Sequence, residues 1–413
     1  MTTRTTTRLA ILGCTGSIGT QTLDVVRNLN TLRPGSVEVV GLATGSRETE
    51  MLAQARAHGV SLTAVAVEGD DAVSSGTTVL RSTDAAERLV RRLVDEDGVD
   101  LFVGAIVGIA GLPATLAAVE AGVDVALANK ETLVAAGELV TAACARTGAR
   151  LLPIDSEHSA LWQALQGLPP EDGVDEPRPG PPLRSPPSRV ARLILTASGG
   201  PFRALDAAAL ARVTPGQALD HPTWSMGAKV TLDCASLMNK GLELMEACWL
   251  FGVPEDRVDI LVHPGSTVHS LVEFDDRSVM AQLGPTDMRL PIQYAITWPD
   301  RPPLDVPPLD LAALGELRFE RHDQERFPAP GLCRRAMRMG GGAGAVLNAA
   351  NEVAVARFLA DDNTSGSVLA FTRIPEIVGE MLEAEPATPI GSLGAVLDLD
   401  RRVRERTRRL LPG

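Results

Sequence analysis

The chain has 413 residues, a length that allows two or three domains with a sizeable core. Its 45% hydrophobic and 22% charged content is ordinary for a folded protein. The formal charge of −13 argues against nucleic acid or an anionic membrane as a partner, but it allows a small anion held by a few local cations.

Along residues 1–154, short apolar runs alternate with helix-like stretches. LAIL (9–12) predicts a buried strand, and 20–29 carries apolar residues at helical spacing. Further strands are expected at 37–43, 101–107, 123–128 and 149–154. Strands alternating with helices predict a parallel, doubly wound, Rossmann-like α/β domain.

The turn GCTGSIG (13–19) lies between the first strand and the first helix. Its G-x-x-G-x-x-G spacing departs from the common dinucleotide fingerprint, but glycines at this place let a backbone approach a pyrophosphate at a helix start. The second strand runs into Arg47 where a NAD-preferring fold has a carboxylate. Arg47 favours NADP, although Glu48 beside it weakens that reading. The alternatives are a ligand-free turn and a solvated arginine.

After residue 154 the chain predicts a central α/β catalytic domain over 155–300. It contains an exposed proline-rich loop at 168–188 and a loop at 218–228 that closes over a ligand. A proline-bearing linker (301–322) and a helical carboxyl-terminal domain (323–413) follow. The basic stretch 401–411 is interpreted as a solvated helix face.

Acidic residues in two segments suggest a metal site. Asp155 and Glu157 follow a predicted strand, and in extended chain they would point the same way. Glu243 and Glu246 lie one turn apart on a predicted helix at 238–250. Carboxylates without clustered cysteine or histidine suit Mg²⁺ or Mn²⁺, whereas the ordinary alternative is a pair of exposed acids.

Several loops offer groups that bind anions. LTASGGPF (195–202) ends a strand with Ser198 and two glycines, which is also compatible with a plain turn. The run LDHPTWSMG (219–227) reads as a closing loop or, alternatively, as a small hydrophobic cluster. Asparagine–lysine pairs at 129–130 and 239–240 are typical phosphate donors.

In this order, the segments resemble the 1-deoxy-D-xylulose 5-phosphate reductoisomerase family across nearly the whole chain. The matching segments are GCTGSIG, ALANKETLV, LLPIDSEHSALWQAL, LTASGGPFR, HPTWSMG, SLMNKGLELMEA, HPGSTVHS and LNAANEVAVARFLA. The resemblance implies a cytoplasmic, homodimeric enzyme of isoprenoid precursor biosynthesis. It implies retro-aldol cleavage and re-addition of the sugar phosphate, followed by hydride transfer from NADPH to yield 2-C-methyl-D-erythritol 4-phosphate.

The resemblance also implies roles for individual residues. The cofactor would be bound by Thr15, Gly16, Ser17, Ile18, Gly45, Ser46, Arg47, Asn129, Glu131, Met226, Gly227 and Met288. One divalent ion, Mg²⁺ or Mn²⁺, would be held by Asp155, Glu157 and Glu243, with Glu246 beside it; these three ligands and Lys130 are the implied catalytic residues. The substrate would be bound by Lys130, Ser156, Glu157, Ser198, His221, Trp224, Cys234, Asn239, Lys240 and Glu243.

Three positions depart from the family pattern. Cys234 replaces a serine of the phosphate pocket, and a thiol is the weaker donor. Gly265 replaces a glutamine, and Thr286 follows a shifted proline near the expected nicotinamide face. These changes concern substrate affinity more than reaction type.

Two alternatives remain open. A semialdehyde dehydrogenase of the same architecture would use a cysteine nucleophile that opens a helix, and Cys234 is the candidate. A diverged paralogue would bind NADPH or sugar phosphate without turnover. The five scattered cysteines form no C-x-x-C pair, which predicts a reducing compartment without disulfides or zinc. The amino-terminal MTTRTTTR lacks an apolar core, and no run of 18 apolar residues occurs, so neither a secretory signal nor a membrane span is expected.

Overall fold

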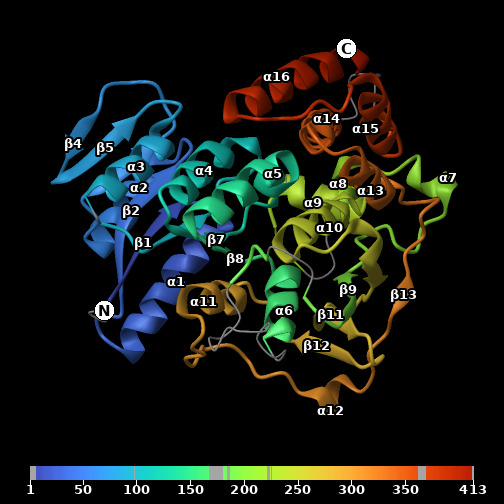
Figure 1. The fold of residues 1–413 in the computed structure, drawn as a ribbon, viewed down its shortest axis with the longest axis horizontal. Helices are drawn as coiled ribbons and strands as arrows, with labels where there is room; N and C mark the ends of the chain where they lie inside the picture. The colour runs from blue at the N-terminus through green and yellow to red at the C-terminus, as the bar shows by residue number, and fades with distance from the viewer. Residues whose placement is uncertain are drawn as a thin grey trace.

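The computed structural model describes residues 6–96, 98–166, 180–183, 187–220, 224, 226–360 and 369–411. Most of the predicted proline-rich loop and part of the predicted closing loop, including His221, lie outside the described residues. In Figure 1, the blue amino-terminal sheet and its helices occupy one side, the central sheet the other, and the orange-to-red carboxyl-terminal helices lie above.

An eight-stranded sheet forms the amino-terminal half, in the order β4-β5-β3-β2-β1-β6-β7-β8. All neighbours are parallel except β4 and β5. The strands are β1 (Thr7–Leu12), β2 (Val37–Thr44), β3 (Leu62–Val65), β4 (Ala72–Ser74), β5 (Thr77–Arg81), β6 (Leu101–Gly104), β7 (Asp124–Leu127) and β8 (Leu151–Pro153). The central strands are continuous apolar runs because helices cover both faces of such a sheet. The Rossmann-like prediction is confirmed.

Helices connect these strands and deliver their first residues to one edge of the sheet. They are α1 (Ser17–Leu32), α2 (Glu48–His58), α3 (Ala85–Asp95), η1 (Ile109–Gly111), α4 (Leu112–Glu120) and α5 (Lys130–Thr147). The turns after β1, β6, β7 and β8 leave the sheet at its carboxyl edge, where open α/β sheets bind ligands.

The central sheet has the order β12-β11-β9-β10-β13, and only β9 and β10 are parallel. Its strands are β9 (Val190–Ala197), β10 (Val258–Val262), β11 (Val268–Phe274), β12 (Val279–Leu283) and β13 (Glu320–Arg321). The surrounding helices are α6 (Ser156–Leu165), α7 (Ala207–Leu210), α8 (Pro215–Ala218), α9 (Ala228–Ala235), α10 (Met238–Phe251), η2 (Glu255–Arg257) and α11 (Arg289–Thr297).

Residues 301–322 contain α12 (Leu311–Leu314) and then β13, which pairs with β10. The carboxyl-terminal region is helical, as expected: α13 (Ala329–Met339), α14 (Ala343–Leu359), α15 (Arg373–Ala384) and α16 (Leu393–Leu410). Helix α14 is its buried centre and contacts α5, α9 and the other three helices. None of the helices in the described ranges is long and apolar enough to cross a membrane.

Two local predictions differ from the structure. Asp155 and Glu157 do not share an extended segment, because α6 begins at Ser156 and Asp155 is its N-cap residue. Glu157 thus lies in the first turn, where the positive end of the helix favours a carboxylate. The strand predicted over 101–107 also stops at Gly104, where the chain turns out of the sheet.

Candidate active site

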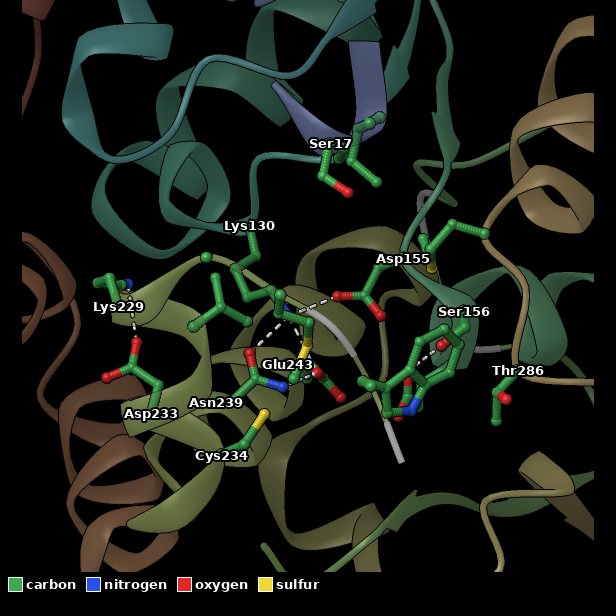
Figure 2. Close-up of a pocket in the computed structure, with 18 of the residues that line it drawn as sticks. Ser17, Lys130, Asp155, Ser156, Lys229, Asp233, Cys234, Asn239, Glu243 and Thr286 are labelled. Carbon is green, nitrogen blue, oxygen red and sulfur yellow. Dashed lines mark hydrogen bonds and ion pairs between the residues drawn. The ribbon is translucent and has the colours of Figure 1, made fainter. Parts of the chain in front are cut away.

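A cavity of about 910 Å³ opens between the carboxyl edge of the first sheet and the central sheet. Its wall combines the turn after β1, the starts of α5 and α6, the end of β9, helices α9 and α10, and the turn before α11. Figure 2 shows Ser17 on one side of this space and the group around Glu243 facing it.

The glycine turn is built for close backbone contact. Gly13 has φ +100°, and a Cβ there would lie 2.5 Å from the oxygen of Ala105. Gly16, Ser17 and Ile18 line the cavity at the start of α1, where free backbone N–H groups favour an anion.

The other residues expected around the nucleotide divide into two groups. Arg47 lines the cavity, whereas Thr15 is buried and its Oγ1 lies 2.5 Å from Thr44 Oγ1. Thr15 therefore joins the ends of β1 and β2 rather than facing the cavity. Gly45 and Ser46 are exposed and do not line the described cavity.

Three carboxylates meet at the cavity floor. Asp155, Glu157 and Glu243 each place an oxygen within 4.8 Å of the others. Such a set of hard oxygen donors fits Mg²⁺ or Mn²⁺. Burial, followed by repulsion from Glu243, raises the pKa of Glu157 to about 7. A bound divalent cation would relieve this repulsion between the acids.

Two ammonium groups lie among these acids. Lys130 Nζ is 2.5 Å from Asp155 Oδ2 and 2.9 Å from Glu243 Oε1. Lys240 Nζ is 2.6 Å from Glu157 Oε1 and also pairs with Glu243. Burial opposes both positive charges, but the carboxylates outweigh it and raise the pKa of each lysine.

A second acidic group, Asp155, His158 and Glu246, shares one residue with the first. His158 Nδ1 lies 3.4 Å from Glu246 Oε2, and both side chains are fully buried. Burial alone would lower the pKa of His158, but Glu246 and Asp155 raise it to about 9. His158 and Glu246 are not among the described residues that line the cavity, so a ligand reaches the first group and not the second.

The rest of the wall carries polar groups suited to a phosphorylated polyol. Ser156 Oγ donates to Glu157 Oε2 at 2.6 Å, and Asn239 Oδ1 accepts from Lys130 Nζ at 2.9 Å. Ser198, Trp224 and Cys234 also line the cavity. Two successive glycines with positive φ let the Ser198 turn pack against α9, since a Cβ at Gly200 would lie 2.8 Å from the oxygen of Cys234.

Cys234 does not open a helix. It lies in the last turn of α9, away from the positive end, and burial raises its pKa to about 12. A neutral thiol at this place is a poor nucleophile, so the dehydrogenase alternative loses its catalytic residue.

Most residues predicted for the site line the same cavity, but sequence reasoning missed several others. Asn129, Glu131, Met226, Gly227 and Met288 lie there as expected. The missed polar residues are Gln21, Asp24, Thr196, Lys229, Asp233, Ser266, His269, Asp287 and Arg289. Many of them lie within or directly beside segments already singled out, but nothing in the sequence tells which side chains of a segment face inward.

Three sequence-family models, each describing a part of the same family of proteins, match successive parts of this chain. They are the 1-deoxy-D-xylulose 5-phosphate reductoisomerase model at residues 9–137, its C-terminal domain at 151–251, and the DXP reductoisomerase C-terminal domain at 283–406. Proteins of that name from Symbiobacterium thermophilum and Pseudomonas aeruginosa PAO1 are similar throughout. The first is 47% identical over 97% of both chains, and the second is 46% identical over 96% of both.

Solved structures of proteins from this family are also similar to the chain over nearly its whole length. The enzyme from Zymomonas mobilis in complex with NADPH matches with a TM-score of 0.81 at 37% identity, over 98% of this chain and 99% of that one. A DOX-P reductoisomerase in complex with NADPH, fosmidomycin and magnesium matches with a TM-score of 0.83 at 36% identity, over 98% of both chains.

Proposed function

The chain belongs to the 1-deoxy-D-xylulose 5-phosphate reductoisomerase family, and from this premise we propose that it converts that sugar phosphate to 2-C-methyl-D-erythritol 4-phosphate. The observation that carries the proposal is the cavity itself. It brings three carboxylates and two lysines to one side of a pocket whose other side is a glycine turn at a helix start.

NADPH is the proposed reductant. The Zymomonas mobilis relative binds it, and this chain offers the Gly16–Ile18 helix start for a pyrophosphate and Arg47 for a 2′-phosphate. Asn129, Glu131, Met226 and Met288 would flank the cofactor further along the cavity. The Thr15 hydroxyl is hydrogen-bonded to the Thr44 hydroxyl, so we expect Thr15 to contact the cofactor through its backbone.

Asp155, Glu157 and Glu243 are the proposed ligands of one Mg²⁺ or Mn²⁺ ion, because they are the acidic group that faces the cavity. When bound, the metal would act as a Lewis acid on substrate oxygens, and NADPH would supply hydride. Lys130, which contacts Asp155 and Glu243, would then turn its charge toward the substrate.

The remaining residues bind and enclose the substrate. Ser198, Asn239 and Lys240 would hold the phosphate, together with His221 from outside the described residues, and Cys234 would add a weak thiol donor. Ser156 lies beside Glu157, where it would meet the substrate hydroxyls. Trp224 would cover the site and exclude water.

The molecule around the site is proposed to have the domain boundaries suggested by the sequence, at 154, 300 and 322. We propose a homodimer, because β12 is an edge strand whose Val279 and Met280 are 50% and 44% exposed. A cytoplasmic setting fits the five cysteines, all of which are free in the described chain.

The Glu243→Gln variant tests the metal assignment. Loss of one charged ligand should lower turnover by at least about a thousandfold and abolish Mn²⁺ binding, while the NADPH dissociation constant stays within about threefold. Glu246→Gln is the comparison, since Glu246 belongs to the second group behind the cavity. If Glu246→Gln abolished Mn²⁺ binding and Glu243→Gln kept it, the metal would belong to that second group.

A further inference from the structure

The distribution of lysine in this chain is uneven. Of its 39 basic residues, 36 are arginines, and only Lys130, Lys229 and Lys240 are lysines. All three line the one cavity described above. All remaining basic positions carry arginine, so the compact ammonium group of a lysine side chain occurs only at this cavity.

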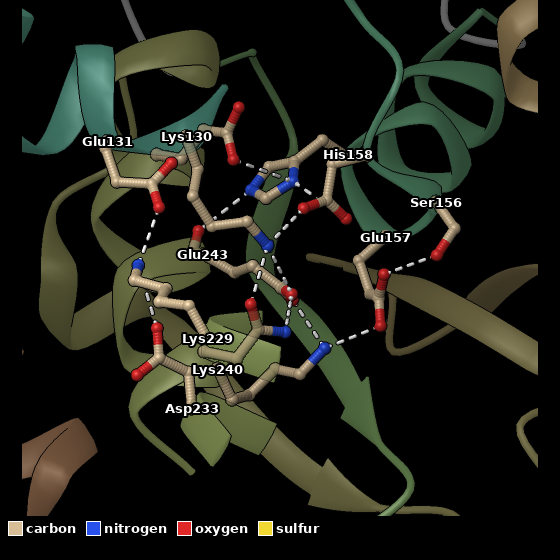
Figure 3. Close-up of polar contacts among 12 residues, drawn as sticks. Lys130, Glu131, Ser156, Glu157, His158, Lys229, Asp233, Lys240 and Glu243 are labelled. Atoms are coloured by element: carbon tan, nitrogen blue, oxygen red, sulfur yellow. Dashed lines mark hydrogen bonds and ion pairs between the residues drawn. The ribbon is translucent and has the colours of Figure 1, made fainter. Parts of the chain in front are cut away.

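Two of these lysines contact the proposed metal ligands, but Lys229 does not. Its Nζ lies 2.6 Å from Glu131 Oε1 and 2.9 Å from Asp233 Oδ2. Figure 3 shows this Glu131–Lys229–Asp233 group beside, and separate from, the group around Lys130 and Glu243. Asp233 Oδ1 in turn accepts from Asn351 Nδ2 of α14 at 2.9 Å.

The group joins helices α5 and α9 at the cavity wall. Glu131 is in the first turn of α5, directly after β7 of the cofactor-binding sheet. Lys229 is in the first turn of α9, two residues after Gly227, where the loop carrying Trp224 and Met226 ends. The contact therefore fixes the end of that loop to the start of α5.

Buried ion pairs stabilise this contact. The Glu131 and Asp233 side chains are only 6% and 1% exposed, and Lys229 is 20% exposed. Burial opposes the charges of Lys229 and Glu131, yet Asp233 and Glu131 raise the pKa of Lys229, and Lys229 lowers the pKa of Glu131. Lys229 and Glu131 are therefore both charged at neutral pH, and removing the ammonium would take the ion-pair partner from two buried carboxylates.

We propose that Lys229 is a positioning residue for NADPH: it holds the Glu131 carboxylate together with Met226 and Gly227, which directly precede α9, as one wall of the cofactor site. This inference rests on the proposed function. A compact ammonium suits a corner where two carboxylates approach a single nitrogen, whereas the longer planar guanidinium of arginine requires more room. An uncompensated Glu131 would also repel an anionic dinucleotide.

The test is the affinity for NADPH alone, measured by fluorescence titration without metal or sugar phosphate. Lys229→Met should raise the NADPH dissociation constant at least about tenfold. Lys229→Arg, which keeps the charge, should fall between this variant and the wild type. In steady-state assays, the KM for NADPH should rise for Lys229→Met, while kcat at saturating NADPH stays within about threefold.

Arg404 provides a matched control. It is also 20% exposed, and it also pairs with two carboxylates, Glu352 and Asp400, between α16 and α14. Among the described residues it is not part of the cavity wall. Arg404→Met should lower the melting temperature but leave the NADPH dissociation constant within about twofold of the wild-type value.

The outcomes separate the claims. A Lys229→Met variant that binds NADPH as the wild type does, or an Arg404→Met variant that binds it equally weakly, would overturn the positioning role. Should Lys229→Met fail to fold, Lys229→Arg decides: binding at least about threefold weaker supports the proposal, and unchanged binding overturns it. A wild-type protein that binds NADPH but never turns over the sugar phosphate would instead refute the proposed function.

Discussion

Cys234 stands where the resemblance to the family predicts a serine of the proposed phosphate pocket. It lines the cavity, and burial keeps it protonated by raising its pKa to about 12. Because a thiol donates a weaker hydrogen bond, Cys234→Ser should lower the KM for the sugar phosphate about fivefold, which corresponds to roughly 1 kcal/mol, with kcat little changed. Steady-state kinetics measures this. Cys248→Ser, at a buried thiol that is not among the described residues lining the cavity, should leave that KM unchanged.

His269 is a second residue whose environment has a measurable consequence. It lies on β11 beside Trp224, and burial lowers its pKa to about 4. An unfolded histidine titrates near 6.5, so between pH 6.5 and 4 the unfolded chain binds a proton that the folded chain does not. The free energy of unfolding should therefore fall by about 2 kcal/mol from pH 7 to pH 5 because of this residue.

Urea unfolding of the wild type and of His269→Gln at both pH values tests that expectation. The variant lacks the titrating ring, so its free energy of unfolding should decline less over this interval. Equal declines in the two proteins would mean that His269 titrates normally in the folded state.

At the scale of elements, helices α5 and α14 pack in closer contact than helix propensities alone predict. Gly344 of α14 approaches α5 so closely that a Cβ would lie 2.0 Å from the backbone oxygen of Val134. Gly344→Ala should therefore destabilise the protein by about 1–3 kcal/mol, although alanine is the better helix former. In contrast, Gly331 of α13 has no neighbouring atom within 4 Å of such a Cβ. Gly331→Ala should be neutral or stabilising by up to about 1 kcal/mol, and thermal unfolding of both variants compares them.

Elements with strong apolar periodicity were predictable, and their junctions were not. The strands around Leu9 and Val39 are continuous apolar runs, which a buried parallel sheet requires. The start of α6 was missed because its first turn carries polar residues that face the cavity. Glu157 was assigned to the site from the sequence, but its place on a helix rather than in extended chain after a strand depends on packing against the central sheet.

At the scale of the whole molecule, the site exists only where distant segments meet. Lys130 follows a strand of the first sheet, and Glu243 lies more than a hundred residues later on α10, yet their side chains are 2.9 Å apart. The sequence identifies such residues by type and by resemblance to a family. It cannot show that Lys229 pairs with Glu131, because that contact depends on how α9 is placed against α5.

The central claim is that this cavity catalyses a metal-dependent, NADPH-dependent conversion of 1-deoxy-D-xylulose 5-phosphate. The most direct measurement is NADPH oxidation by the purified protein with that substrate, with Mg²⁺ or Mn²⁺ and then with a chelator. We predict oxidation that requires both substrate and metal and that stops when the chelator is added. NADPH binding without oxidation under any metal condition would contradict the claim and would identify the chain as a non-catalytic relative.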